Sequence, residues 1–324
     1  MSARIEPSHV TVLAGGVGAA RLLRGLVAAI HPDRVTAVVN TGDDTEMHGL
    51  AISPDVDTIV YTLAGAIDPE RGWGLAGESW QAMAALERYG SARPRQSTAG
   101  STWFRLGDRD LATHLYRTAR AAEGGTPTDV TAEIAKAWQI GVTLLPMTEG
   151  RFRTMIGLAG GDVVPFQDYF VRLRHDVPIE SISFEREGCE LNPAARSAIE
   201  RSDVVVIAPS NPFVSIGPIR ALPGVDALLA ARRESVVAVS PIVGGRALKG
   251  PADRMMAELG VEPSVIGVAR LYAPIAATLV VDTLDAHLAD DVEAAGMRCV
   301  VTPTVMESPE VARALALACL GAAS

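Results

Sequence analysis

The first forty residues carry the feature that most constrains the fold, a short apolar strand that runs through a glycine turn into an amphipathic helix. Residues 9–14 (HVTVLA) are apolar and β-branched, which is typical of a buried strand. Three glycines follow within residues 15–18, and apolar side chains then recur at helical spacing over residues 19–30. A second apolar run at 34–40 is placed parallel to the first strand by the right-handed crossover rule. This order of elements is half of a Rossmann unit.

The rest of the chain predicts one α/β domain over residues 1–324, a doubly wound, Rossmann-like parallel sheet with an inserted smaller α+β subdomain. We expect the core to comprise residues 8–125 and 191–324, because buried apolar strands alternate with helices again after residue 191. Residues of about 126–190 contain a helix and short strand-like runs, which predict the insertion. The predicted helices lie at 56–66, 79–89, 111–122, 130–138 and 308–320, and the predicted further strands at 142–145, 153–158, 179–184, 203–208, 236–240 and 278–282.

Composition excludes several classes of protein. The formal net charge of −9 leaves no basic excess to hold a nucleic acid or an anionic membrane surface. The three cysteines are widely spaced and form no CxxC or Cys/His pattern, so neither a disulfide framework nor a zinc site is predicted. The sequence has no signal-peptide pattern and no apolar run of about 20 residues. We therefore expect a cytoplasmic protein whose partners are small molecules, with no nucleic acid and no membrane.

The glycine turn predicts a site for a phosphate group. A strand that enters a helix through Gly15, Gly16 and Gly18 leaves backbone N–H groups free at the positive end of the helix dipole. No Gly-Lys-Ser/Thr follows, so this is not a Walker A loop, and Arg21 stands where a dinucleotide fingerprint has its third glycine. Arg21 opposes the dipole in the first helical turn, which favours a position facing a bound anion. The alternative interpretation is a plain tight turn.

A cluster of aspartates lies just past the second predicted strand, where open α/β sheets bind their ligands. Asn40 ends that strand, Asp43 and Asp44 follow it, and Asp55 and Asp57 come soon after. Two carboxylates about 4 Å apart repel by roughly 4 kcal/mol at an effective dielectric of 20, so a converging cluster needs a cation. Oxygen-only ligands suit magnesium beside phosphates. For Asp55 we favour a helix cap at residue 56, and for Asp57 a functional role.

The segment LGDRD at 106–110 begins a predicted helix. Asp108 as the N-cap and Asp110 in the first turn would explain two of its charges structurally. Arg109 has no such explanation and could bind a phosphate. His114, further along the same helix, is interpreted as a packed or surface histidine.

Two loops after later strands add polar candidates. Ser210 and Asn211 lie between two prolines directly after the strand at 203–208, so their donors and acceptors suit a base edge or a ribose. Lys249 follows Gly-Gly-Arg at 244–246 and could meet a further phosphate, with a simple surface turn as an equal alternative. The sequence shows no Ser/His/Asp or Cys/His arrangement of a covalent nucleophile.

Six segments spread over most of the chain carry a resemblance to a known family. They are LAGGVGAAR (13–21), VVNTGDD with HGL (38–50), SPDVDTIVYTLAG (53–65), RGWG (71–74), WFRLGDRDLATH (103–114) and APSNPFVSIGPI (208–219). In combination they resemble the 2-phospho-L-lactate and phosphoenolpyruvate transferases of coenzyme F-420 biosynthesis, in their actinobacterial, CofD-like form. The loop at 91–102 is longer than this resemblance leads us to expect.

The resemblance implies transfer of a phosphoenolpyruvyl or 2-phospholactyl group from a guanosine diphosphate-type donor to the ribityl hydroxyl of the deazaflavin Fo, with release of GMP. It also implies Mg²⁺ as a cofactor and a homodimer. Asp43, Asp44 and Asp57 are then the expected catalytic and metal-binding residues, one of them accepting the proton of the attacking hydroxyl. The expected substrate-binding residues are Gly15, Gly16, Gly18, Arg21, Asn40, Trp103, Asp108, Arg109, Ser210, Asn211 and Lys249.

Two other functions stay open at this point. A nicotinamide-dependent oxidoreductase needs an acidic residue about 20 residues after the glycines, which Asp43 or Asp44 roughly supplies, but the third glycine is missing. A non-catalytic nucleotide-binding regulator would share the glycine turn and the sheet. Asp57 counts further against the oxidoreductase, and the segment at 103–114 favours the transferase over the regulator.

Overall fold

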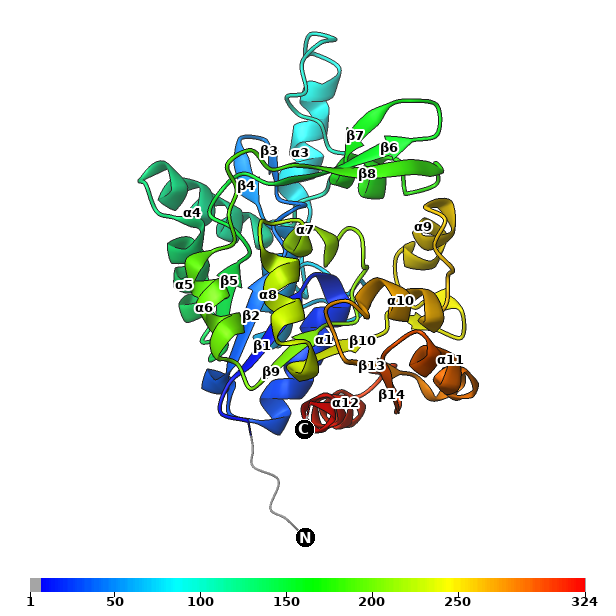
Figure 1. The fold of residues 1–324 in the computed structure, drawn as a ribbon. Helices are drawn as coiled ribbons and strands as arrows, with labels where there is room; N and C mark the ends of the chain where they lie inside the picture. The colour runs from blue at the N-terminus through cyan, green and yellow to red at the C-terminus, as the bar shows by residue number, and fades with distance from the viewer. Residues whose placement is uncertain (1–6, 324) are drawn as a thin grey trace.

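The computed structural model describes residues 7–323, and its centre is a seven-stranded sheet in which neighbouring strands are all parallel. The strand order is β14-β13-β10-β9-β1-β2-β5 (Figure 1). The predicted doubly wound, Rossmann-like α/β class is confirmed by this order. The strands are β1 (Val10–Ala14), β2 (Val35–Val39), β5 (Thr143–Pro146), β9 (Val204–Ile207), β10 (Val236–Val239), β13 (Thr278–Val281) and β14 (Arg298–Val301).

Helices cover both faces of this sheet because its strands are apolar on both sides. Val12 and Ala14 of β1 pack into one core, whereas Leu13 between them packs into the other. Successive side chains of a strand point to opposite faces, so a continuous apolar strand contributes side chains to the core on each face of the sheet. The first core includes α1 (Gly16–Ala29), α2 (Pro54–Leu63), α5 (Pro127–Ala137) and α12 (Pro309–Ala322), and the second α6 (Pro193–Arg201), α8 (Val225–Ala231), α10 (Val265–Tyr272) and α11 (Ala289–Ala294).

The insertion was predicted at about 126–190, and the structure places its start later in the chain. Helix α5 leads into β5, and β5 pairs in parallel with β2 at the edge of the main sheet. The separate unit is a three-stranded antiparallel sheet of order β7-β6-β8, formed by β6 (Arg153–Leu158), β7 (Val163–Pro165) and β8 (Ile179–Glu185). A four-residue strand has too little pattern to show which sheet it joins, because its partner lies a hundred residues away.

The three-stranded sheet lies above the carboxyl ends of the central strands (Figure 1). The backbone N–H of Thr154 in β6 donates a 2.7 Å hydrogen bond to the carbonyl of Gly42, which ties the small sheet to the polar turn after β2. The remaining elements are β3 (Thr45–Met47), β4 (Leu50–Ile52), α3 (Gln81–Gly90), α4 (Asp110–Ala122), α7 (Gly217–Arg220), β11 (Ile242–Val243), β12 (Arg246–Ala247), α9 (Ala252–Glu258), three 3₁₀ segments (Pro32–Arg34, Arg233–Ser235, Thr283–Leu288) and a π-helical turn (Asp168–Arg172).

The connections diverge between β1 and β9. The chain leaves β1 toward α1 on one face of the sheet and leaves β9 toward α7 and α8 on the other. Doubly wound sheets bind ligands at the carboxyl ends of two strands whose connections part in this way, and we call this position the crevice. The glycine turn and the loop at 209–216 border this crevice.

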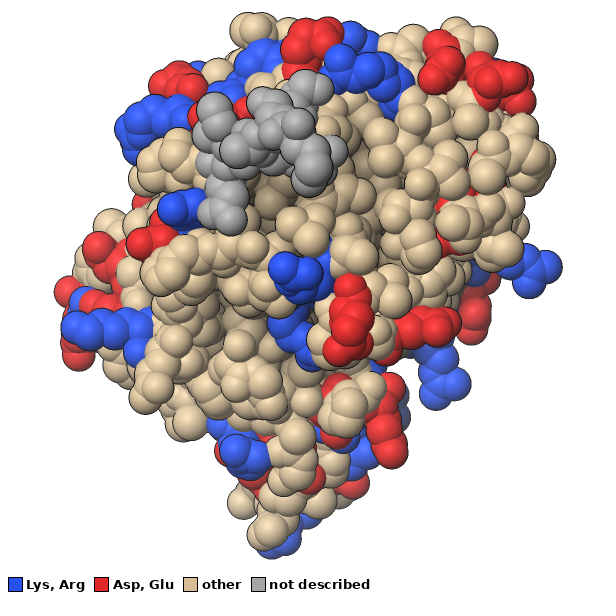
Figure 2. Space-filling model, turned by 90° about the horizontal axis from the view of Figure 1, so that it is seen from below, with Lys and Arg blue, Asp and Glu red and all other residues tan. Residues whose placement is uncertain are grey.

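The opposite end of the molecule shows no continuous basic surface in the part that is described. There, lysines and arginines are interspersed with aspartates and glutamates around a largely uncharged centre (Figure 2). No helix within residues 7–323 is long and apolar enough to span a bilayer.

Candidate active site

The glycine turn presents the amino end of α1 at the crevice. Gly15 is the N-cap, and Gly16 begins the helix with a φ of 70°, which a residue with a side chain rarely adopts. A Cβ on Gly18 would lie 2.3 Å from the carbonyl oxygen of Pro209, so only glycine lets the two loops approach this closely. The first turn of α1 contains no acidic side chain. The N–H of Gly16 already donates to Asp55, so the N–H groups of Val17 and Gly18 are the ones that could meet an anion.

Asp55 faces this turn and does not serve as the helix cap that the sequence favoured. Helix α2 begins at Pro54, and the Asp55 carboxylate reaches across to accept a 2.8 Å hydrogen bond from the backbone N–H of Gly16. Its other oxygen accepts a 2.9 Å hydrogen bond from the Asn40 amide. Sequence analysis missed this role because a partner 39 residues away cannot be seen in local spacing.

The side chain of Asn40 connects the residues of the polar cluster by hydrogen bonds. Its side chain is fully buried, and its NH₂ group donates to carboxylate oxygens of Asp43 and Asp55 and to the carbonyl of Val214. Its carbonyl oxygen accepts the N–H of Gly42 at 2.8 Å. One side chain thus holds the turn after β2, the start of α2 and the loop after β9 in a fixed arrangement. We expected Asn40 to bind substrate, but its amide is occupied by the protein itself.

Burial makes negative charge costly in this cluster. It raises the pKa of Asp43 well above the usual range, and the neighbouring carboxylates Asp55 and Asp44 raise it further. Burial likewise raises the pKa of Asp44 to about 8, against a hydrogen bond from Ser53 that lowers it. It raises the pKa of Asp55 to about 6, although Asn40 and the Gly16 N–H stabilise the anion. A cation beside these carboxylates would offset this cost, and carboxylate oxygens are ligands that magnesium prefers. Among the described residues, however, the group that brings three ligand atoms within 4.8 Å of one another is Asp57, Asp110 and His114 and not these three.

Asp57 is placed differently from the other predicted catalytic aspartates. Both of its carboxylate oxygens accept hydrogen bonds from the guanidinium of Arg117 in α4, one of them at 3.1 Å. The two side chains are 7% and 12% exposed, so this is a buried ion pair. The expectation that Asp57 shares a metal with Asp43 and Asp44 stays a prediction, and in this structure the guanidinium of Arg117 balances the charge of Asp57.

His114 belongs to the same buried network. Its Nδ1 lies 3.7 Å from Asp57 and its Nε2 lies 3.3 Å from Asp110, which also accepts a hydrogen bond from the Tyr61 hydroxyl. Asp57, Asp110 and His114 place ligand atoms within 4.8 Å of one another, a spacing that a metal could use. The Arg117 guanidinium nevertheless lies against Asp57 and 3.3 Å from His114 Nδ1, and a second cation there would be repelled. We interpret the network as structural support whose charged members, Arg117 and Asp57, lie close enough to Asp44 to affect its pKa.

Asp108 and Glu78 cap each other's helices. The Asp108 carboxylate accepts the first N–H groups of α3 and the hydroxyl of Ser79, which lowers its pKa. The Glu78 carboxylate accepts the backbone N–H groups of Arg109 and Asp110 at the start of α4. The prediction that Asp108 caps α4 is therefore wrong. Asp108 caps the neighbouring helix α3. The Arg109 side chain donates to the carbonyl of Ala76, so both predicted ligands stabilise the protein itself.

Ser210 and Asn211, the predicted substrate-binding residues of the loop after β9, both make hydrogen bonds to the backbone of the protein. The Ser210 hydroxyl donates a 2.7 Å hydrogen bond to the carbonyl of Gly15. The Asn211 carbonyl oxygen accepts the N–H groups of Phe213 and Val214, which shapes the loop as an Asx turn. These bonds fix the loop against the glycine turn and leave little of either side chain for a base.

Arg21 and Lys249 bring positive charge to the same turn. Partial burial and the nearby Arg21 lower the pKa of Lys249, so the two cations lie close enough to repel each other. Two adjacent cations beside free helix N–H groups are the features of a phosphate site. Trp103 is partly buried and packs edge-on against Phe104 at 5.9 Å between ring centroids, after the mostly exposed loop at 91–102.

Comparison with known proteins identifies the family. The family model described as 2-phospho-L-lactate transferase CofD matches residues 10–308. The chain belongs to this family. A protein of Kitasatospora aureofaciens named phosphoenolpyruvate transferase is 41% identical over 321 residues, covering 97% of this chain and 98% of its own. One of the same name from Mycobacterium tuberculosis H37Rv is 40% identical over 321 residues, covering 93% of this chain and 94% of its own.

Solved structures with the same fold are more distant in sequence. A member of the UPF0052 family from Bacillus halodurans has a TM-score of 0.60 at 18% identity, covering 98% of this chain and 99% of that chain. At this identity the likeness supports the fold alone.

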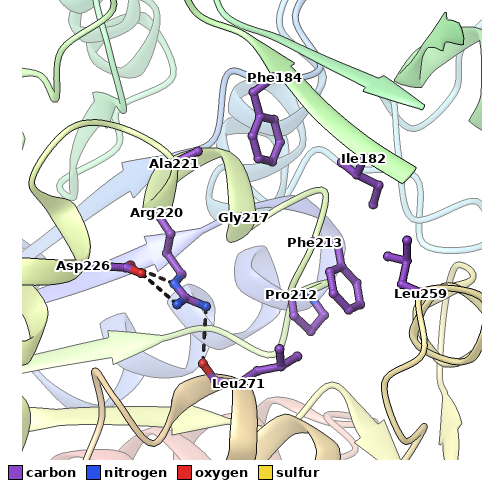
Figure 3. Close-up of a pocket in the computed structure, with 10 residues that line it drawn as sticks. All are labelled: Ile182, Phe184, Pro212, Phe213, Gly217, Arg220, Ala221, Asp226, Leu259 and Leu271. Carbon is purple, nitrogen blue, oxygen red and sulfur yellow. Dashed lines mark hydrogen bonds and ion pairs between the residues drawn. The ribbon is translucent and has the colours of Figure 1, made fainter. Parts of the chain in front are cut away.

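A pocket of about 400 Å³ adjoins the loop after β9 in this CofD-family chain (Figure 3). Phe184 of β8 and Phe213 of the loop form apolar walls. Arg220 and Asp226 also line the pocket and form a 2.9 Å ion pair, so their charges already neutralise each other. The loop that lines this pocket also contacts Asn40 through Val214, which links the pocket to the acidic cluster.

Proposed function

We propose that this member of the CofD family transfers a phosphoenolpyruvyl group from a guanosine diphosphate-type donor to the ribityl hydroxyl of the deazaflavin Fo, with release of GMP. The observation that carries the proposal is that Asp55, bonded to Gly16 of the glycine turn, shares the Asn40 amide with Asp43. Relatives of about 40% identity are named phosphoenolpyruvate transferases, which favours the enolpyruvyl donor over the 2-phospholactyl donor.

The proposal includes Mg²⁺ bound by the acidic cluster. Three carboxylates with raised pKa values, buried beside an anion site, need a counter-charge, and oxygen donors suit a hard cation. Asp43, Asp44 and Asp55 would hold the ion, and it would neutralise charge that develops on the transferring phosphate. Asp57 is assigned a supporting part, because its ion pair with Arg117 orients the helix that carries Asp55.

The donor diphosphate is expected at the amino end of α1, with Arg21 and Lys249 beside it. Reaction would occur by attack of the ribityl hydroxyl oxygen on the phosphorus that carries the enolpyruvyl group. The bond from that phosphorus to the oxygen of GMP breaks, GMP leaves with that oxygen, and the hydroxyl proton passes to an aspartate of the cluster. Such a transfer needs positioning and charge neutralisation but no covalent nucleophile.

A transfer assay tests the proposal. Purified protein is incubated with Fo, magnesium and each guanylylated donor in turn, and the fluorescent deazaflavin is separated by chromatography. A more acidic fluorescent product together with GMP, both lost with a chelator, is the expected result. Absence of product from both donors with folded protein would reject the proposal. We also propose a homodimer on family membership alone, and a monomer by light scattering would contradict it.

A further inference from the structure

Two indole rings beside the glycine turn have no part in the site described so far. Trp73 lies in the loop before α3, and Trp80 directly precedes that helix. Their ring centroids are 6.3 Å apart and their planes are tilted by 60°. Trp73 is 47% exposed, although an indole of this size is usually buried in a single chain. An exposed ring next to a ligand crevice is a candidate contact for a ligand.

Guanidinium groups hold the two rings in place. The Arg71 guanidinium lies 5.4 Å from the centroid of each indole, and Arg105 lies 5.5 Å from that of Trp80. Arg71 is itself fixed by a 2.9 Å ion pair with Asp68 and a 3.0 Å hydrogen bond to the carbonyl of Leu75. The arrangement is thus preorganised, and its positive charge favours an electron-rich ring above it.

The loop that carries Trp73 touches the proposed phosphate site. A Cβ built on Gly72 would lie 2.6 Å from Lys249 Nζ and 3.8 Å from Val17 Cγ1, and Val17 belongs to the glycine turn. Trp73 directly follows Gly72, so its side chain begins close to the proposed phosphate site. A substrate whose phosphates bind at that site could therefore reach the Trp73 ring. Trp80 is anchored from the other side, because Asp108 caps the helix that follows it.

We propose that Trp73 and Trp80 form a stacking platform, in which the exposed Trp73 indole stacks on the planar heteroaromatic ring of a substrate and Trp80 supports it through Arg71. The inference rests on the proposed function, which supplies two such rings, the deazaflavin of the acceptor and the guanine of the donor. Stacking on an aromatic side chain contributes about 1–3 kcal/mol per base, which corresponds to a change in Kd of about 5- to 150-fold. Because each ring has a face to stack, the experiment must separate the two ligands.

Binding measurements on single variants test the platform without relying on turnover. Kd is measured for Fo by the change in its fluorescence and for GDP by calorimetry, with wild type, Trp73→Ala, Trp80→Ala and Trp73→Phe. We expect the alanine variants to raise the Kd of one ligand by about 10- to 100-fold. Trp73→Phe should restore that ligand to within about threefold, because a phenyl ring retains a stacking face. The ligand whose Kd rises shows whether the deazaflavin of Fo or the guanine of the donor stacks on the platform.

Tyr89→Ala is the matched control, because Tyr89 is 58% exposed on α3 and lies outside the platform. It should bind both ligands as wild type does. Alanine variants that remain folded by circular dichroism and bind both ligands within twofold of wild type would overturn the platform while leaving the proposed function intact. Wild-type protein that binds neither Fo nor GDP would instead reject the proposed function, and the platform with it.

Discussion

The amide of Asn40 donates a 2.9 Å hydrogen bond to the carboxylate of Asp55, which in turn accepts the N–H of Gly16. This relationship joins the end of β2, the first turn of α2 and the amino end of α1 into one unit. Asn40 also donates to Asp43, so a single neutral donor lies between two acidic side chains. Asn40 therefore helps to fix the positions of both carboxylates.

Replacement of Asn40 should damage folding and function together. Asn40→Asp puts a third acceptor where the two carboxylates need a donor, and it adds charge to a buried cluster. We expect a loss of about 2–4 kcal/mol in the free energy of unfolding, because several buried polar groups lose their partner. Denaturant unfolding measures this loss, and a change below about 0.5 kcal/mol would contradict the central position of Asn40.

Asp55→Asn should separate function from stability. The substitution keeps the shape of the side chain but removes a charge whose burial raises its pKa to about 6. Turnover should fall by about 100-fold or more if Asp55 helps to hold the cation, while the melting temperature in chelator stays equal or rises. Asp33→Asn is the control, since Asp33 has a side chain 71% exposed and far from the crevice. Full turnover in Asp55→Asn would remove it from the site.

The pair of Asp57 and Arg117 should respond as a buried ion pair. Asp57→Asn alone leaves the guanidinium without its counter-charge and should destabilise the protein by about 3–5 kcal/mol. The double variant Asp57→Asn with Arg117→Met should recover most of this loss and retain more than a tenth of wild-type turnover. Thermal unfolding and the transfer assay measure both. A stable, inactive double variant would return Asp57 to the catalytic set.

Stability without metal should fall as the pH rises. Asp44 has a pKa of about 8 when folded, against an ordinary value near 3.8, so between these values the folded state keeps a proton that the unfolded state has lost. The free energy of unfolding should therefore decrease from about pH 4 to about pH 8, by up to about 1.4 kcal/mol per pH unit for this proton. Denaturant titrations in chelator measure the slope, and Asp44→Asn should flatten it between pH 6 and 8. A slope unchanged in that variant would assign it to other groups.

Local patterns predicted most elements of the fold, because their causes are local. The glycine turn and α1, the strands at the centre of the sheet and the closing helix α12 all lie within a few residues of the predicted ranges. Strand β5 was assigned to the insertion, since a short edge strand is defined by its pairing with β2 rather than by its own residues. The capping of α3 by Asp108 was missed for the same reason, because its partners lie 26 to 29 residues away.

The sequence by itself determined the fold class, the family and the place of the crevice, since strand periodicity, the glycine turn and the ordered segments are properties of neighbouring residues. Only the tertiary structure decided which side chains face that crevice. It turned Asp55 toward Gly16 and paired Asp57 with Arg117, and it engaged Asn211 within its own loop. The physical reason is that a buried charge or amide takes the partner that packing brings near it, and packing joins segments far apart in the chain.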